Sequence, residues 1–206
     1  MQAVSGWYPV KAGAVFAAIL LVVVSRGRDR PPIAAFGLAN IITTIRAFFV
    51  ALLAGFIGEA AHTTIAASAA GIGAVTMTLD GVDGWAARRA RSESRFGERF
   101  DMEVDALLVQ VLAILVWQHG KAGPWVLLSG LMRYLFGAAG WIWPWLQQPV
   151  VPNVQRKAIC IIQITGLLIA LWPSVTPPAS ALIAAVALIF LSYSFLVDTV
   201  WLWQRR

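Results

Sequence analysis

The sequence predicts an all-α integral membrane protein, and three observations support this fold class. Hydrophobic residues make up 59% of the 206 residues and charged residues only 13%, whereas a soluble domain is nearer half apolar and a quarter charged. Seven apolar stretches follow one another, each close to the roughly 20 residues that a helix needs to cross a bilayer. Short connections rich in glycine and proline separate them, which leaves no room for a soluble domain between the spans.

The predicted spans can be placed in order along the chain. They cover residues 8–25, 39–57, 63–88, 101–117, 124–143, 157–172 and 178–203. Pro9 and Lys11 shorten the first stretch, which either spans the membrane or lies partly in the interface. Its basic residues follow the apolar run instead of preceding it, so the pattern is not that of a cleavable signal peptide. A short surface helix is expected at residues 31–38, before the second span.

Basic residues indicate how the spans are oriented. With seven spans, most of them fall on one side of the membrane, while Lys11 and Lys121 fall on the other. The first group is Arg26, Arg28, Arg30, Arg88, Arg89, Arg91, Arg95, Arg99, Arg156, Lys157, Arg205 and Arg206. The positive-inside rule places that side in the cytoplasm. It also explains the basic pI of about 10.2 without a nucleic-acid partner.

Four carboxylates interrupt the apolar pattern around the third connection. Asp80 and Asp83 are spaced i, i+3, and Asp101 and Asp105 are spaced i, i+4, so each pair lies on one helical face. An ionised group inside a span costs about 2.5–3.5 kcal/mol even on lenient insertion scales, so a positive partner is required. Oxygen ligands without histidine or cysteine favour a hard cation such as Mg²⁺, Mn²⁺ or Ca²⁺. Salt bridges to the neighbouring arginines are the structural alternative.

The spacing of these residues resembles the signature of the CDP-alcohol phosphotransferase family, D-x2-D-G-x2-A-R-x8–9-G-x3-D-x3-D. Every fixed position is filled, and they are Asp80, Asp83, Gly84, Ala87, Arg88, Gly97, Asp101 and Asp105. Eight identities at defined spacing are far more specific than a short glycine motif. The resemblance implies a six-transmembrane-helix core bundle over about residues 39–203. Residues 1–30 then form an additional N-terminal transmembrane or interfacial helix with a basic loop, and residues 31–206 form the membrane domain.

The resemblance also implies a reaction and a metal site. Family members cleave the pyrophosphate of a CDP-linked substrate, transfer a phosphoryl-alcohol unit to a second hydroxyl and release CMP. Their four aspartates hold two divalent cations, so Asp80, Asp83, Asp101 and Asp105 would bind Mg²⁺ or Mn²⁺. Asp105 would in addition be the general base. The chemistry agrees, because paired cations stabilise the attacking and leaving oxygens and the acceptor hydroxyl needs a base.

Two groups of residues are candidates for nucleotide binding. Within the signature, small side chains at Gly84 and Ala87 would let the cytosine ring approach the backbone, and Arg88 would contact a phosphate. Helix packing and topology marking are the alternatives for these three. The pattern N-x2-T-x2-R, formed by Asn40, Thr43 and Arg46, is common near the nucleotide in the family and shares one helical face. Asn40 can also be read as a helix N-cap.

Three further basic residues are candidates for binding the phosphate of the acceptor or of the lipid. Arg133 lies well inside the fifth span, where an ionisable residue suggests function. Arg156 and Lys157 begin the sixth span. The alternatives are an internal salt bridge for Arg133 and snorkelling to the interface for Arg156 and Lys157.

The expected function is phosphatidyl transfer from CDP-diacylglycerol to a small polar alcohol, such as glycerol 3-phosphate. The motif equally allows a soluble CDP-alcohol to donate to a lipid hydroxyl. A divalent-cation transporter and a non-catalytic membrane protein are the alternatives from other classes. The resemblance further implies a homodimer, for which the sequence gives no independent sign. We expect the protein in a bacterial inner (cytoplasmic) membrane, with its active site facing the cytoplasm.

Overall fold

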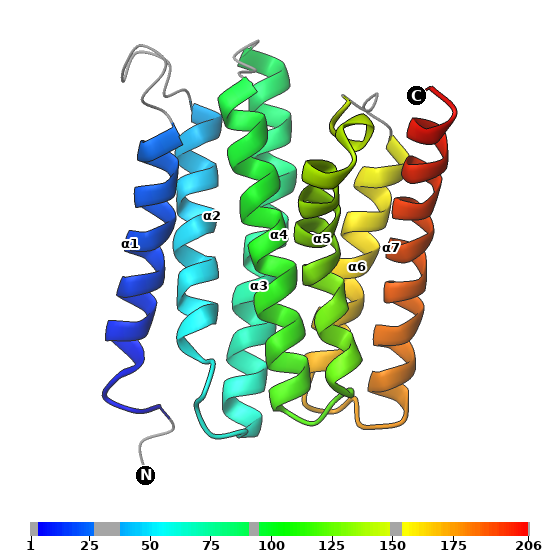
Figure 1. Ribbon diagram of the computed structural model, residues 1–206. Helices are drawn as coiled ribbons and strands as arrows, with labels where there is room; N and C mark the ends of the chain where they lie inside the picture. Colours follow the sequence, from blue (N-terminus) through cyan, green and yellow to red (C-terminus); the bar gives the residue numbers. More distant parts are fainter. Residues whose placement is uncertain (1–3, 27–37, 91–94, 149–153, 206) are drawn as a thin grey trace.

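Seven α-helices form one bundle in the described part of the chain (Figure 1). The computed structural model describes residues 4–26, 38–90, 95–148 and 154–205, except for the side chains of residues 23–26, 38–39, 82–90, 95–96, 98, 147 and 154. The helices are α1 (Tyr8–Arg26), α2 (Leu38–Gly55), α3 (Thr63–Ala90), α4 (Arg95–Gln118), α5 (Leu128–Ile142), α6 (Val154–Leu171) and α7 (Ala179–Trp203). The all-helical class is confirmed, since these residues contain no strand.

The helices run up and down in sequence order, so the N-terminus and the C-terminus lie at opposite ends of the bundle (Figure 1). Helix α2 packs against α1, α3 and α4, and α6 packs against α3, α4 and α7. By contrast, α3 and α4 contact each other only sparsely. The two helices that carry the signature aspartates are therefore positioned largely through α2 and α6.

The predicted stretches coincide with the helices, with differences at a few ends. Helix α4 begins at Arg95, six residues before the predicted start, and α6 begins at Val154. The fifth element starts as a 3-10 helix, Pro124–Leu127, and a second 3-10 helix, Pro144–Gln147, follows α5. Proline is favoured in a first turn because its missing N–H would have no partner there. The surface helix expected at residues 31–38 lies almost wholly outside the described residues.

Among the described residues, two helices are long and apolar enough to cross a membrane. They are Pro124–Ile142 and Ala179–Trp203, while Tyr8–Val22 and Asn40–Gly55 are shorter apolar helices. Helices α3, α4 and α6 carry charged residues, and the side chains at one end of each are outside the described residues. Seven membrane crossings, and six for the core, therefore stay a prediction.

The interior of the bundle is apolar and closely packed around α4. Leu108, Leu112 and Leu115 on this helix have no exposed surface, and their i, i+4, i+7 spacing is that of a buried helical stripe. Between α6 and α7, a Cβ placed on Gly166 would lie 2.8 Å from the Cβ of Ala187. Small residues at such a contact let two helices approach closely.

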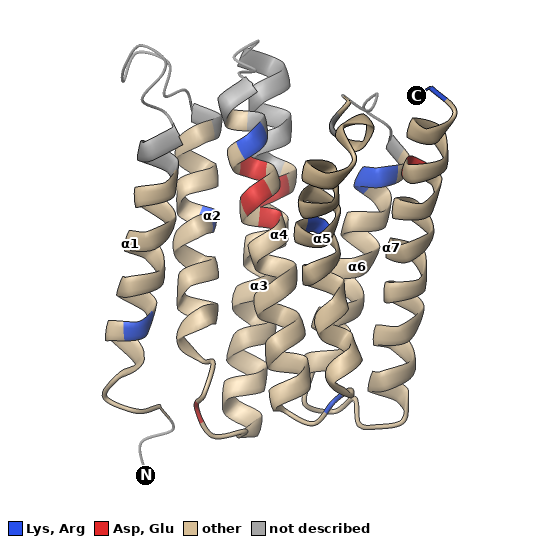
Figure 2. Ribbon diagram, viewed as in Figure 1, with Lys and Arg blue, Asp and Glu red and all other residues tan. Residues whose placement is uncertain are grey.

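Charged residues lie near both ends of the bundle, and basic residues also lie partway along α2 and α5 (Figure 2). We call the end of the bundle that holds the start of α1, the α2–α3 connection and the connection after α4 the lysine end (lower end in Figure 1). Lys11, Glu59 and Lys121 lie in these segments. The upper part, which carries Asp80, Asp101 and Asp105, is the aspartate end.

Polar contacts join the connections of the bundle at the lysine end. Lys11 forms an ion pair with Glu59, whose carboxylate also accepts hydrogen bonds from the backbone N–H and the hydroxyl of Ser5, each at 2.7 Å. The amide of Gln118 donates to the carbonyls of Phe56 and Glu59 at 3.2 and 2.9 Å. The N-terminal segment, the α2–α3 connection and the end of α4 are thereby tied together.

Candidate active site

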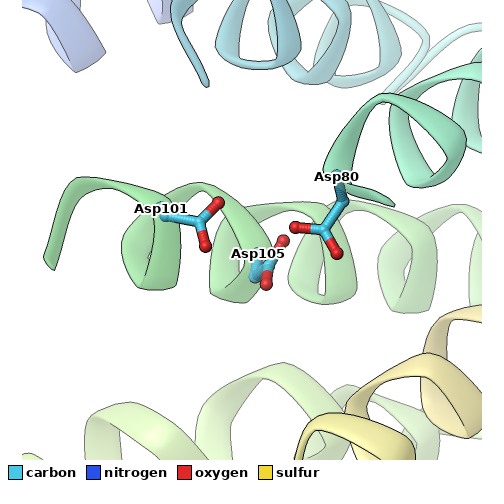
Figure 3. Close-up of side chains that lie close together, drawn as sticks. All are labelled: Asp80, Asp101 and Asp105. Atoms are coloured by element: carbon cyan, nitrogen blue, oxygen red, sulfur yellow. The ribbon is translucent and has the colours of Figure 1, made fainter. Parts of the chain in front are cut away.

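Three of the signature aspartates converge at the aspartate end. Asp80 lies on α3, and Asp101 and Asp105 lie one turn apart on the antiparallel helix α4. One oxygen from each carboxylate lies within 4.8 Å of the others, and all three residues are partly buried. Figure 3 shows the three side chains pointing toward one another. The helical-face prediction from the i, i+4 spacing is met for Asp101 and Asp105, and α3 supplies Asp80 from the facing side.

Arg46 on α2 sits among these carboxylates. Its side chain has no exposed surface, and its Nη1 lies 3.0 Å from Oδ1 of Asp80. It also donates hydrogen bonds to Oδ1 of Asp101 and Oδ1 of Asp105. A guanidinium group has five N–H donors in a planar fork, so one residue can bridge all three aspartates.

The side chains of the pattern N-x2-T-x2-R lie on one face of α2, as their spacing predicts, and this face is buried in the bundle. Asn40 and Thr43 are buried with 5% and 3% of their surface exposed, and Arg46 is buried below them on α2. The sequence assigned Arg46 to the nucleotide, and its contact with the aspartates was not foreseen. The only available signal was the need for a positive partner near four carboxylates, which does not say which of several arginines supplies it.

The charges at this end do not balance among the described contacts. Three carboxylates face one guanidinium. Two like charges about 4 Å apart repel by roughly 4 kcal/mol at an effective dielectric constant near 20. Further positive charge would relieve this repulsion.

The donor set tests whether a divalent cation fits the site. The three groups offer oxygen ligands, their oxygens lie close enough to share one ion, and they are partly shielded from solvent. Hard cations such as Mg²⁺ and Mn²⁺ prefer such ligands. The residues therefore fit a divalent cation, with Asp80, Asp101 and Asp105 as its candidate ligands.

The remaining signature residues on α3 cannot be placed in the same detail. Asp83, Gly84, Ala87 and Arg88 all lie within the helix, but their side chains fall outside the described residues. Their predicted roles in metal and nucleotide binding stay predictions. Gly97 lies near the start of α4, close along the chain to Asp101.

The three basic candidates for phosphate binding have separate surroundings. Nη2 of Arg133 lies 3.0 Å from Oε1 of Glu103, which joins α5 to α4. Nε of Arg156 lies 2.9 Å from a carboxylate oxygen of Asp198, which joins α6 to α7. Lys157 is exposed. The ion-pair alternative for Arg133 thus describes its contact in this structure, and phosphate binding by the three residues stays a prediction.

The sequence gives different information about Glu103 and Asp198, the carboxylates that pair with Arg133 and Arg156. Glu103 comes two residues after Asp101, an offset that turns its side chain to another face of the helix, where it contacts Arg133. Asp198 lies 42 residues from Arg156, and no local pattern connects the two. The α6–α7 pairing that brings them together is a tertiary contact.

A helical bundle with oxygen ligands for a hard cation near one end fits a membrane-bound, metal-dependent transferase of phosphate-containing groups. Comparison with known families agrees, since the family described as CDP-alcohol phosphatidyltransferase matches residues 36–197. The chain belongs to this family. No curated protein and no solved structure gave a significant match.

Family membership establishes several general properties. The protein is a transferase of the phosphotransferase type, and its family is membrane-integral and works on CDP-alcohol substrates. A divalent metal is generally used in the family, in agreement with the aspartate cluster. Helix α1 precedes the matched residues, and its role as an addition to the family's core stays a prediction.

Proposed function

We propose that the protein transfers a phosphatidyl group from CDP-diacylglycerol to a small polar alcohol, such as glycerol 3-phosphate, and releases CMP. The observation that carries this proposal is the convergence of Asp80, Asp101 and Asp105 in a chain of this family. We assign the metal ligands to these three residues and to Asp83. Two divalent cations held there would stabilise the charge that develops on the phosphate oxygens.

Asp105 is proposed as the general base. In this structure Arg46 donates a hydrogen bond to its Oδ1, which orients the carboxylate on α4 before cations bind. The other oxygen is assigned the proton of the acceptor hydroxyl as the bond to phosphorus forms. A hydroxyl is a poor nucleophile until a base takes its proton, and such a base typically contributes about 10²–10⁴-fold to the rate.

A lipid donor suits the exposed surface of the bundle. Large apolar side chains are exposed along α5 and α7, among them Leu131, Leu135, Ile189, Phe190 and Leu196. In a bilayer this surface meets acyl chains, so a CDP-activated lipid would reach the aspartate end laterally with its head group toward the carboxylates. The nucleotide contacts are assigned to Asn40, Thr43, Arg46, Gly84, Ala87 and Arg88.

Lys157 is the basic candidate that the contacts support best as a ligand for an acceptor or lipid phosphate. It is exposed and makes no ion pair with Glu103 or Asp198, and its helix α6 packs against α4, the helix of Asp101 and Asp105. Arg133 and Arg156 would have to exchange Glu103 and Asp198 for the phosphate. We keep all three as proposed ligands, with Lys157 first.

The test is CMP release by purified protein. The protein is incubated with CDP-diacylglycerol, Mg²⁺ or Mn²⁺ and a panel of alcohols that includes glycerol 3-phosphate, and the lipid product is identified by mass spectrometry. We expect CMP and a new phospholipid with one acceptor. Product formation only from a soluble CDP-alcohol and a lipid hydroxyl would reverse donor and acceptor, and no CMP from any pair would refute the proposal.

In Figure 2 the acidic residues of α3 and α4 lie nearer the upper end of the bundle than the lower end. Coupling-ion sites in transporters typically lie near the bilayer midplane, on broken helices, whereas Asp80, Asp101 and Asp105 belong to continuous helices. This position favours a transferase over a divalent-cation transporter. The positive-inside pattern would place this end in the cytoplasm, which cysteine labelling from each side of oriented vesicles would test.

A homodimer is also proposed. An exposed face of α3 carries small residues at Gly71, Ala74, Thr78 and Gly81, and a Cβ on Gly71 or Gly81 would meet nothing within 4 Å. Small residues let helices of two subunits approach closely in a membrane. Light scattering of the detergent-solubilised protein should give twice the mass of 22.3 kDa, and substitution of Gly71 by Leu should shift it toward the monomer.

A further inference from the structure

Arg46 is the most deeply buried charged side chain in the described part of the structure. It lies on a helix of apolar character and has no exposed surface, and Lys121 is the other buried basic residue among the described side chains. A buried charge is tolerated only when it is paired and hydrogen-bonded. Three carboxylates supply that pairing, so Arg46 and the aspartates stabilise one another.

The guanidinium also connects helices that otherwise touch little. Asp80 comes from α3 and Asp101 and Asp105 come from α4, and these two helices have few contacts with each other. Helix α2 packs against both. Arg46 therefore stands between the two halves of the aspartate site and holds their carboxylates together.

The same carboxylates are the candidate ligands for divalent cations. A carboxylate oxygen that accepts a charge-assisted hydrogen bond from a guanidinium group offers less to a cation, and two positive groups held by the same three residues repel each other. The pairing of Arg46 with Asp80, Asp101 and Asp105 and full coordination of cations by these residues are thus alternative states.

We infer that Arg46 is an internal counter-cation of the metal site. Its guanidinium holds Asp80, Asp101 and Asp105 together in the metal-free protein, and it must release some of these carboxylates before divalent cations bind them. Released from the aspartates, it becomes available to donate to a phosphate of the substrate. This inference rests on the proposed function, because it assumes that the aspartates bind divalent cations.

The test compares metal binding and stability in the absence of any nucleotide. The full chain, Arg46→Gln and the control Lys11→Gln are purified in detergent and stripped with chelator. Free Mn²⁺ is then titrated by electron paramagnetic resonance, and thermal unfolding is recorded with EDTA and with Mn²⁺. Lys11→Gln also removes one basic partner of a carboxylate, but at the lysine end.

Arg46→Gln should bind Mn²⁺ about tenfold more tightly or better, because a competing positive charge is gone. In EDTA it should unfold at a lower temperature than the unsubstituted protein. Addition of Mn²⁺ should raise its unfolding temperature by more than that of the unsubstituted protein. Lys11→Gln should lower the unfolding temperature in both conditions and leave the Mn²⁺ affinity unchanged. The Mn²⁺ affinity of Arg46→Lys should lie between those of the unsubstituted protein and Arg46→Gln, since a single ammonium group cannot bridge the carboxylates as a planar guanidinium group does.

Unchanged or weaker Mn²⁺ binding by a folded Arg46→Gln protein would overturn the inference. If that variant survives purification only with Mn²⁺ present, the inference is supported, and failure of Mn²⁺ to rescue it counts against the inference. The proposed function fails separately. Its failure would appear as no Mn²⁺ or Mg²⁺ binding and no CMP release by the unsubstituted protein.

Discussion

The two ends of the bundle handle charge in opposite ways. At the lysine end, Lys11 faces Glu59 one to one, and Lys121 donates to the carbonyls of Trp172, Pro173 and Val175 at 3.1, 3.2 and 2.6 Å. At the aspartate end, one guanidinium is shared by three carboxylates. The lysine end satisfies its own charges, whereas the described contacts of Asp80, Asp101 and Asp105 leave this cluster with more negative than positive charge.

This difference separates a structural cluster from a candidate active site. A balanced cluster gains nothing from a further ion, so it can fix the connections of the bundle permanently. An excess of buried negative charge destabilises the protein until something positive arrives, and such strain is characteristic of functional sites. Substitutions at the two ends should accordingly have different consequences.

The largest effect is expected from Asp105→Asn. It removes the proposed base and one metal ligand, so CMP release should fall by about a thousandfold or more. The assay is CMP release with CDP-diacylglycerol and the best acceptor. Glu59→Gln at the lysine end is the control and should keep its activity, and full turnover by Asp105→Asn would remove the assignment of the base.

Neutralising one acid should have opposite effects on stability at the two ends. In EDTA, Asp101→Asn should raise the unfolding temperature, because one guanidinium then faces two carboxylates and the repulsion falls. Glu59→Gln should lower it, because Lys11 loses its charged partner. Thermal unfolding in chelator measures both. A lower unfolding temperature for both variants would show that the aspartate end carries no excess negative charge.

Lys121→Met should destabilise the lysine end without affecting the metal site. The ammonium group is buried and donates to three carbonyls of the α6–α7 connection, and an unpaired buried acceptor costs about 1–3 kcal/mol. We expect a lower unfolding temperature in detergent and an unchanged affinity for Mn²⁺. An altered Mn²⁺ affinity would mean that the two ends are coupled.

The smallest expected effect is a pH dependence of stability at the lysine end. The hydrogen bond from Lys11 is the main cause that lowers the pKa of Glu59 from 4.5 to about 2, and hydrogen bonds from Ser5 act in the same direction while burial opposes them. A pKa lowered by folding gives stability that is fully present above the unfolded value and is lost as the pH falls through the folded one.

The loss should therefore occur between pH 4.5 and about 2. The difference in unfolding temperature between the unsubstituted protein and Glu59→Gln should shrink over this interval, because protonation of Glu59 removes the charge that the substitution removes. Thermal scans at matched ionic strength measure this difference. A difference that is constant down to about pH 2 would contradict the lowered pKa.

The sequence by itself determined the helical class, the approximate bounds of the helices and the family. These follow from local properties: apolar length predicts helices, and the spacing of Asp101 and Asp105 fixes their common face because one helical turn is 3.6 residues. The eight signature positions are likewise within a single stretch of chain, so no tertiary information was needed to find the aspartates.

Only the tertiary structure decided which charges pair. Arg46 lies 55 residues from Asp101, and Arg156 lies 42 residues from Asp198; both pairs depend on which helices are neighbours and how they are rotated. Several arginines near the signature were equally plausible partners in the sequence. The packing of α2 against α3 and α4 is the physical reason that Arg46, and not one of the others described, stands among the three carboxylates.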